Sequence, residues 1–129
     1  MTAVSSERLA RRLAALADSK KAEDVVVLDM RALVAYTDFL AICTARNERQ
    51  ARAIVDEVRL RVKRDTGLLP GGVEGGDDAG WTILDYLDCV LHVFTPEARD
   101  RYQLEELWRD ASRLELDLDA PEAPSAASA

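Results

Sequence analysis

Two short apolar runs separated by two residues constrain the fold of this chain more than any other feature. Trp81 to Asp85 reads W-T-I-L-D and Asp88 to Phe94 reads D-C-V-L-H-V-F, and only Tyr86-Leu87 lies between them. Alternating runs rich in β-branched and aromatic residues are typical of strands, and a two-residue connection is typical of an antiparallel hairpin. The sequence therefore predicts a β-hairpin over residues 81–94.

One helix and two strands are predicted before the hairpin. Ser5 or Ser6 can cap a helix that runs to about Asp18, because apolar residues recur there at helical spacing. The segment 24–30 (D-V-V-V-L-D-M) is dense in β-branched residues and predicts a strand. The segment 38–44 (D-F-L-A-I-C-T) is apolar on both sides, which favours a strand covered on both faces.

A second helix is predicted from Asn47, and a third after the hairpin. Asn47 can cap the second helix, with Gln50 three residues later and Gly67 as its stop. Its apolar stripe consists of Ala51, Ile54, Val55, Val58 and Val62. Residues 68–80 hold most of the glycines, so we expect a loop there, or a loop flanking a short strand. Thr95-Pro96 then opens a helix through about Arg113. Its buried side is expected to be Tyr102, Leu104, Leu107, Trp108 and Ala111.

The order helix, strand, strand, helix, strand, strand, helix predicts an α/β fold. A chain of 129 residues favours a single compact domain, here residues 1–115, with a mixed sheet packed with helices. Residues 116–129 form an acidic Pro/Ala/Ser tail that we expect to be disordered.

Composition excludes several function classes. No apolar run reaches the 18 residues that a membrane span needs, and residues 1–17 lack the apolar core of a secretory signal. A net charge of −7 disfavours broad binding to RNA or DNA, whereas an acidic protein can dock on a basic protein. Cys43 and Cys89 lie in apolar strands and are expected to be buried free thiols in a reducing cytoplasm.

A two-residue turn at Tyr86-Leu87 would place Asp85 opposite Asp88, Ile83 opposite Val90 and Trp81 opposite His92. One face of the hairpin would then carry Trp81, Ile83, Asp85, Asp88, Val90, His92 and Phe94. The other face, with Thr82, Leu84, Cys89, Leu91 and Val93, is more uniformly apolar and suits packing under helices. Opposed like charges destabilise a sheet unless a basic partner meets them, so the first face is the candidate docking surface.

Structural interpretations of the same residues remain open. Trp81 fits the core as well as a partner contact, His92 alone is more often a structural histidine, and Asp85 and Asp88 fit a solvated turn. Catalysis has less support, because Cys89 and His92 are three residues apart in a strand and point to opposite faces. A metal site from Asp85, Asp88 and His92 would lack a close fourth ligand. The run G-G-V-E-G-G has no phosphate-loop lysine. We expect no cofactor, no metal and no enzyme activity.

Four blocks of sequence, in order, carry a resemblance to a known family. They are T-D-F-L-A-I-C-T-A-R-N-E-R-Q (37–50), L-L-P-G-G-V-E-G (68–75), W-T-I-L-D-Y-L-D-C-V-L-H-V-F (81–94) and R-D-R-Y-Q-L-E-E-L-W-R-D-A (99–111). Over about residues 9–114 the chain resembles the ribosomal silencing factor, or Iojap-related, family. It departs from the family pattern at Ala45 and Leu87, where the family has Gly, and at Asn47, where it has Ser.

The resemblance implies a mixed-sheet fold similar to a minimal nucleotidyltransferase core, often a homodimer in isolation. The Gly-Ser turn and Asp-x-Asp pair of those enzymes are absent from residues 9–114, which carry the resemblance. The implied function is binding to ribosomal protein fourteen of the large subunit, which blocks joining of the small subunit and lowers translation when nutrients are scarce. Organellar relatives are linked instead to large-subunit assembly. An assembly adaptor and, more remotely, a nucleotide-binding enzyme are the alternatives.

The residues expected to bind the partner combine charge with aromatic area. Glu74, Asp85 and Asp88 would supply charge, Trp81 and Tyr86 buried aromatic area, and His92 lies beside Trp81 on the same face.

Overall fold

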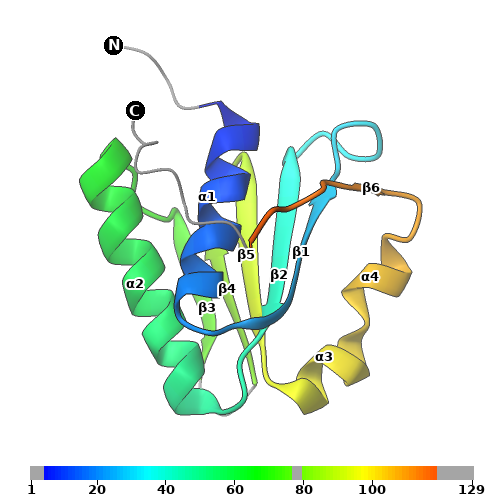
Figure 1. The fold of residues 1–129 in the computed structure, drawn as a ribbon. Helices are drawn as coiled ribbons and strands as arrows, with labels where there is room; N and C mark the ends of the chain where they lie inside the picture. The colour runs from blue at the N-terminus through cyan, green and yellow to red at the C-terminus, as the bar shows by residue number, and fades with distance from the viewer. Residues whose placement is uncertain (1–4, 77–79, 119–129) are drawn as a thin grey trace.

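A mixed β-sheet with helices on both faces forms the centre of the molecule (Figure 1). The computed structural model describes residues 5–76 and 80–118. Helices are α1 (Ser6–Ser19), α2 (Glu48–Thr66), α3 (Pro96–Tyr102) and α4 (Leu104–Leu107). Strands are β1 (Glu23–Asp29), β2 (Phe39–Thr44), β3 (Gly72–Gly76), β4 (Trp81–Asp85), β5 (Cys89–Phe94) and β6 (Ser112–Arg113). The strand order is β3-β4-β5-β2-β1-β6, and the β2–β5 pair is parallel. The predicted α/β fold with a mixed sheet is confirmed.

The caps read from the sequence begin and end the first two helices. The Ser5 side chain accepts a hydrogen bond from the Arg8 amide at the start of α1. The Asn47 side chain does the same for the Gln50 amide at the start of α2. Gly67 ends α2 in the left-handed conformation, with φ 80°, which glycine adopts without steric cost. For residues 68–80 the sequence predicted either a loop or a loop flanking a short strand, and β3 is that short strand.

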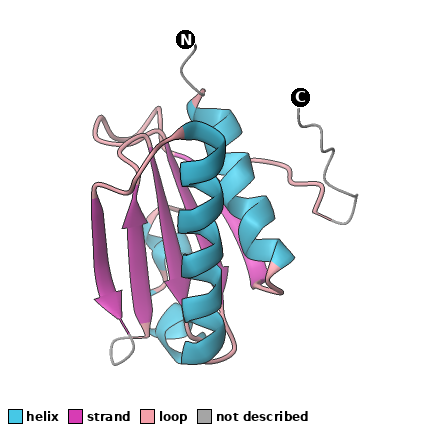
Figure 2. Ribbon diagram, turned by 90° about the vertical axis from the view of Figure 1, so that its left-hand side faces the viewer, coloured by secondary structure: helices cyan, strands magenta, loops and turns pink. Residues whose placement is uncertain are grey.

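The sheet separates two hydrophobic cores. Figure 2 shows α1 and α2 side by side over one face of the strands. Their apolar stripes pack on β2, β4 and β5 through Phe39, Leu84, Leu91 and Val93, all nearly inaccessible to solvent. A smaller core on the other face joins Phe94 and Ile42 to α3 and α4. Every residue of β2 is buried, as predicted for a strand covered on both faces. No helix of the described residues is long and apolar enough to cross a membrane.

The hairpin register differs from the prediction by two residues. The structure pairs Asp85 with Val90, Ile83 with His92, and Trp81 with Phe94. The Tyr86 amide donates to the Cys89 carbonyl at 2.9 Å, so the turn is Leu87-Asp88 and not Tyr86-Leu87. Tyr86 is buried and continues the first strand by one residue, so the two-residue turn lies one position later than predicted. Because side chains alternate with period two, a slip of two leaves the two predicted faces unchanged.

The third helix is shorter than predicted. It ends at Tyr102, because Gln103 adopts a left-handed conformation with φ 47°, and a single further turn forms α4. Arg113 lies in β6, where it pairs with Leu28 of β1. The break turns the chain so that Trp108 packs on the smaller core while Leu107 is 66% exposed. Leu107, and Tyr102 with 41% of its surface exposed, are therefore not on the buried side that the sequence predicted.

Candidate partner-binding site

A hydrogen bond between Trp81 and His92 organises the hairpin face that the sequence singled out. The indole Nε1–H of Trp81 donates to Nδ1 of His92 at 2.9 Å. Since Nδ1 accepts, the proton of the neutral imidazole is on Nε2. Trp81 is half-buried and His92 is buried. The structure thus brings these two predicted site residues together as one unit across β4 and β5.

Two further rings complete an aromatic cluster around Trp81. Its ring lies 5.1 Å from that of Phe94, directly opposite on β5, and 4.6 Å from that of Tyr102 on α3. Ring pairs at these separations add stability beyond their buried area. The sequence placed Phe94 on this face, but the contact with Tyr102 depends on how α3 folds back on the sheet. Tyr102 remains 41% exposed, so the cluster reaches the molecular surface.

Burial sets the protonation of His92. Loss of hydration in the sheet lowers its pKa from 6.5 to about 4, and the nearby Asp85 carboxylate opposes this only in part. The imidazole is therefore neutral at physiological pH and acts through hydrogen bonding. His92 is therefore a structural histidine that holds Trp81 in place, as the structural interpretation of the sequence expected.

Asp85 precedes the tight turn and Asp88 lies within it, and the two aspartates differ in what they do. The Asp85 carboxylate accepts a hydrogen bond from the Leu87 amide at 2.7 Å and so holds the turn. Leu87 has φ 71° and is 70% exposed, so the backbone adopts there the left-handed conformation that glycine favours. Asp88 is exposed, and its carbonyl accepts from the Asp38 and Phe39 amides. Its carboxylate thus lies at the solvated end of the hairpin, next to β2.

Tyr86 and Glu74 are not brought to the Trp81 cluster. Tyr86 is buried in the main core, on the α1–α2 side of the sheet, with its hydroxyl oxygen unpartnered among the described residues. Burial also raises the pKa of its hydroxyl. Glu74 pairs through its backbone with Ile83, in β3 beside the hairpin. The Glu74 side chain lies outside what the structure describes.

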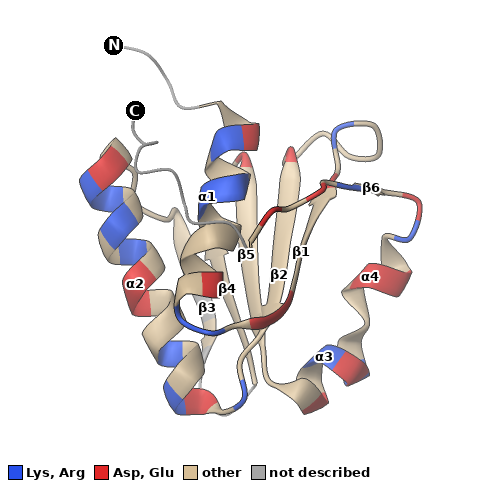
Figure 3. Cartoon of the chain, viewed as in Figure 1, with Lys and Arg blue, Asp and Glu red and all other residues tan. Residues whose placement is uncertain are grey.

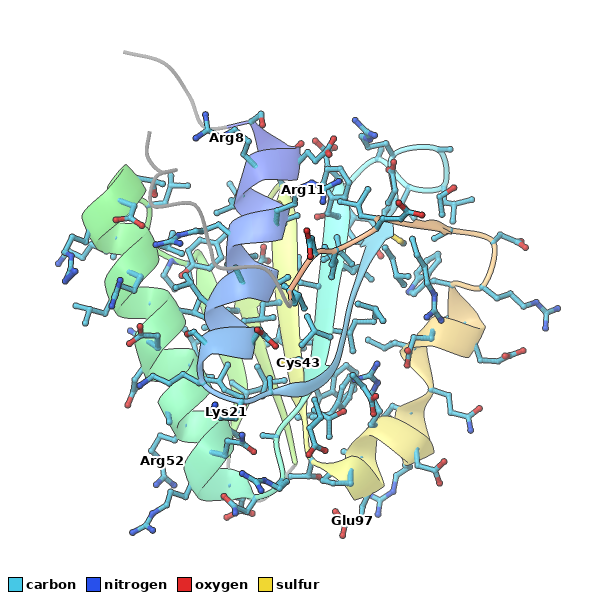
Figure 4. The ribbon with its side chains drawn as sticks, viewed as in Figure 1. Arg8, Arg11, Lys21, Cys43, Arg52 and Glu97 are labelled. Carbon is cyan, nitrogen blue, oxygen red and sulfur yellow. The ribbon has the colours of Figure 1, made fainter. Side chains whose placement is uncertain are left out.

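The cysteines are placed as expected of buried free thiols. Figure 4 shows Cys43 inside the fold, among the strands. Burial raises the pKa of both the Cys43 and the Cys89 thiol to about 12, so neither forms a thiolate at neutral pH. Cys89 donates to the Ser6 carbonyl on the main-core side, away from His92. Within residues 5–76 and 80–118, no group of three His, Cys, Asp or Glu side chains could hold a metal ion.

Comparison with known proteins places the whole chain in one group. The sequence profile described as "Ribosomal silencing factor during starvation" matches residues 3–129. A ribosomal silencing factor of Halalkalibacterium halodurans is 37% identical over 114 residues, 88% of this chain and 97% of the relative. That of Bacillus subtilis is 38% identical over 104 residues, 81% of this chain and 87% of the relative. A mouse protein named for mitochondrial assembly of the ribosomal large subunit is 29% identical over 101 residues, 74% of this chain and 43% of the relative.

Solved structures show the same architecture. A crystal structure from Bacillus halodurans superposes with a TM-score of 0.69 at 36% identity, covering 85% of this chain and 96% of the other. A crystal structure from Chromobacterium violaceum has a TM-score of 0.78 at 24% identity, covering 93% and 97%. The second likeness bears on the fold alone.

Proposed function

Since the chain belongs to the ribosomal silencing factor family, we propose that it binds the large ribosomal subunit through ribosomal protein fourteen. The bound protein blocks joining of the small subunit and represses translation when nutrients are limiting. It works in the cytoplasm, without a cofactor, and forms a homodimer when free.

The Trp81–His92 unit is the observation that carries the proposed docking site. A half-buried tryptophan fixed by a hydrogen bond and two ring contacts is a rigid anchor, and such anchors dominate protein interfaces. Asp85 and Asp88 add negative charge at the turn end of the same hairpin, which suits a basic ribosomal protein. Glu74 of the neighbouring strand belongs to the proposed surface, and Tyr86 supports it from the core side.

Binding rather than catalysis is the proposed mode of action. The pair that could have formed a nucleophile and a base is separated by the sheet, since Cys89 faces the main core and His92 the opposite side. A thiol whose pKa is about 12 is also a poor nucleophile at neutral pH.

Sedimentation of ribosomal subunits tests the proposal. Purified large subunits are incubated with the protein, and small subunits are then added under conditions that favour joining. We expect the protein to co-sediment with large subunits and to prevent the joined particle from forming. Absence of the protein from the large-subunit fraction, or normal joining in its presence, contradicts the proposal.

A second candidate function is assembly of the large subunit without silencing. It is favoured by the mouse relative, whose name refers to assembly of the mitochondrial large subunit. A deletion strain distinguishes the two functions. Accumulation of immature large subunits with normal survival of starvation supports assembly, whereas mature subunits with poor survival support silencing.

A further inference from the structure

The charges of this acidic protein are divided unequally along the chain. Residues 1–66 have a formal net charge of +3 and residues 67–129 one of −10, although the whole chain has −7. Helix α2 alone carries six of the 17 Lys and Arg residues. Figure 3 shows them as blue bands that recur along the length of α2. Helix α2 also carries Glu48, Asp56, Glu57 and Asp65, so its own net charge is +2 within a chain of −7.

Four of the six cations of α2 face solvent without an ion pair among the described residues. Arg49, Arg59, Lys63 and Arg64 are exposed, and none forms an ion pair within the described part of the chain. Arg61, by contrast, pairs with Glu57 of the same helix. Arg49 and Lys63 are fourteen residues apart, which corresponds to about 21 Å along a helix. A row of unneutralised cations of this length can contact several charges of one extended anionic partner.

This row lies away from the proposed docking site. The buried stripe of α2 packs on the sheet face opposite to that of Trp81 and His92. At the side of α2, a groove of about 220 Å³ is lined by Arg52 and Arg59, by the carboxylates Glu48 and Asp56, and by residues of β3 and β4. Figure 4 shows Arg52 on the side of α2 that is away from α1. A partner on α2 and a partner on the hairpin face can therefore be bound together.

We propose that the outer side of α2 binds the phosphate backbone of RNA on the large ribosomal subunit while the hairpin face binds a ribosomal protein. This inference rests on the proposed function. Arginine predominates among the exposed cations, and its planar guanidinium fits phosphate oxygens in pairs. The sequence of α2 has no aromatic residue, and its outer side has one exposed large apolar side chain, Leu60. Protein interfaces ordinarily use aromatic anchors, so this surface suits phosphates better than a protein.

Salt dependence of binding to whole large subunits provides the test. The variant combines Arg49→Gln, Arg59→Gln and Lys63→Gln, and its matched control combines Arg61→Gln, Arg109→Gln and Arg113→Gln. Both lose three positive charges, but each of the control residues forms an ion pair with a glutamate. Each lost phosphate contact reduces the slope of log affinity against log salt by about 0.7–0.9. We expect the α2 variant to lose about two units of slope and at least about tenfold in affinity at moderate salt, and the control much less.

Binding to isolated ribosomal protein fourteen separates this inference from the proposed function. The α2 variant should bind that protein as well as the wild type does. If the wild type itself fails to bind it, the docking proposal is wrong, and the slopes on whole subunits still test α2.

Three results would overturn the RNA contact. One is equal slopes for the α2 variant and its control. Another is that the α2 variant loses as much affinity for isolated ribosomal protein fourteen as for whole subunits, which would make the partner of α2 a protein. The third is low-salt self-association of the wild type that the α2 variant abolishes, which would make the partner the acidic half of a second copy.

Discussion

At the scale of single residues, His92 links burial to stability. It is the only histidine of the chain, and burial lowers its pKa from 6.5 to about 4. Between these pH values the unfolded chain binds more protons than the folded one. The contribution of His92 to folding stability is therefore fully present above pH 6.5 and is lost as the pH falls towards 4. The difference corresponds to on the order of 3 kcal/mol.

Urea unfolding between pH 7 and 4.5 measures this loss, and His92→Gln should remove most of it. Asp29 and Glu105 have pKa values lowered by their hydrogen bonds with Arg31 and Arg99, so their contributions are lost only at more acidic pH. A wild-type stability that does not change between pH 7 and 4.5 would contradict the buried neutral imidazole.

Trp81 can be tested for structure and docking in one sample. Trp81→Phe keeps a ring against Phe94 and Tyr102 but removes the N–H that His92 accepts, which should cost about 1 kcal/mol of folding stability. Trp81→Ala should cost about 3 kcal/mol, since it also removes the ring. Loss of an interfacial tryptophan commonly weakens binding about thirtyfold. Melting and co-sedimentation are measured together, and a folded Trp81→Ala variant with full binding removes Trp81 from the site.

At the scale of elements, β3 depends on one glycine. Gly75 has φ 89°, and a Cβ atom there would overlap the carbonyl oxygen of Trp81 on β4. Gly75→Ala should therefore separate β3 from β4 and destabilise the fold by about 3 kcal/mol or more. Gly72→Ala is the matched control, because nothing lies within 4 Å of a Cβ there. Chemical denaturation compares the two, and similar stabilities would contradict the close approach of the strands.

At the scale of the whole molecule, the chain beyond β6 contributes to the main core. Leu114 and Leu116 pack against it, and Arg11 of α1 donates to the Glu115 carbonyl at 2.8 Å. A chain ending at Leu118 should unfold at the same urea concentration as the full chain. One ending at Arg113 should lose about 2 kcal/mol, because two half-buried leucines are removed. Equal stability of the two truncated chains would exclude this contribution. The tail was predicted over residues 116–129, of which 119–129 lie outside the described residues, and a loss of stability on removing 119–129 would contradict disorder in that part.

Local signals in the sequence determined most of the elements. Ser5, Asn47 and Gly67 act within a few residues of themselves, so the caps and ends of α1 and α2 could be predicted without the fold. The alternation of the two hairpin runs also determined which side chains share a face. That Trp81 and His92 share one face followed from that alternation, and the slip of two residues did not change it, although Trp81 pairs with Phe94.

Only the tertiary structure decided features that depend on contacts between distant segments. The two-residue turn lies one position later than predicted, with Tyr86 buried under α1 and α2, and the break at Gln103 let the chain turn so that Arg113 could pair with β1. The contact of Tyr102 with Trp81 joins helix and strand across the smaller core. Sequence spacing encodes local periodicity, whereas these features arise from which apolar surfaces are available to be buried when the whole chain folds.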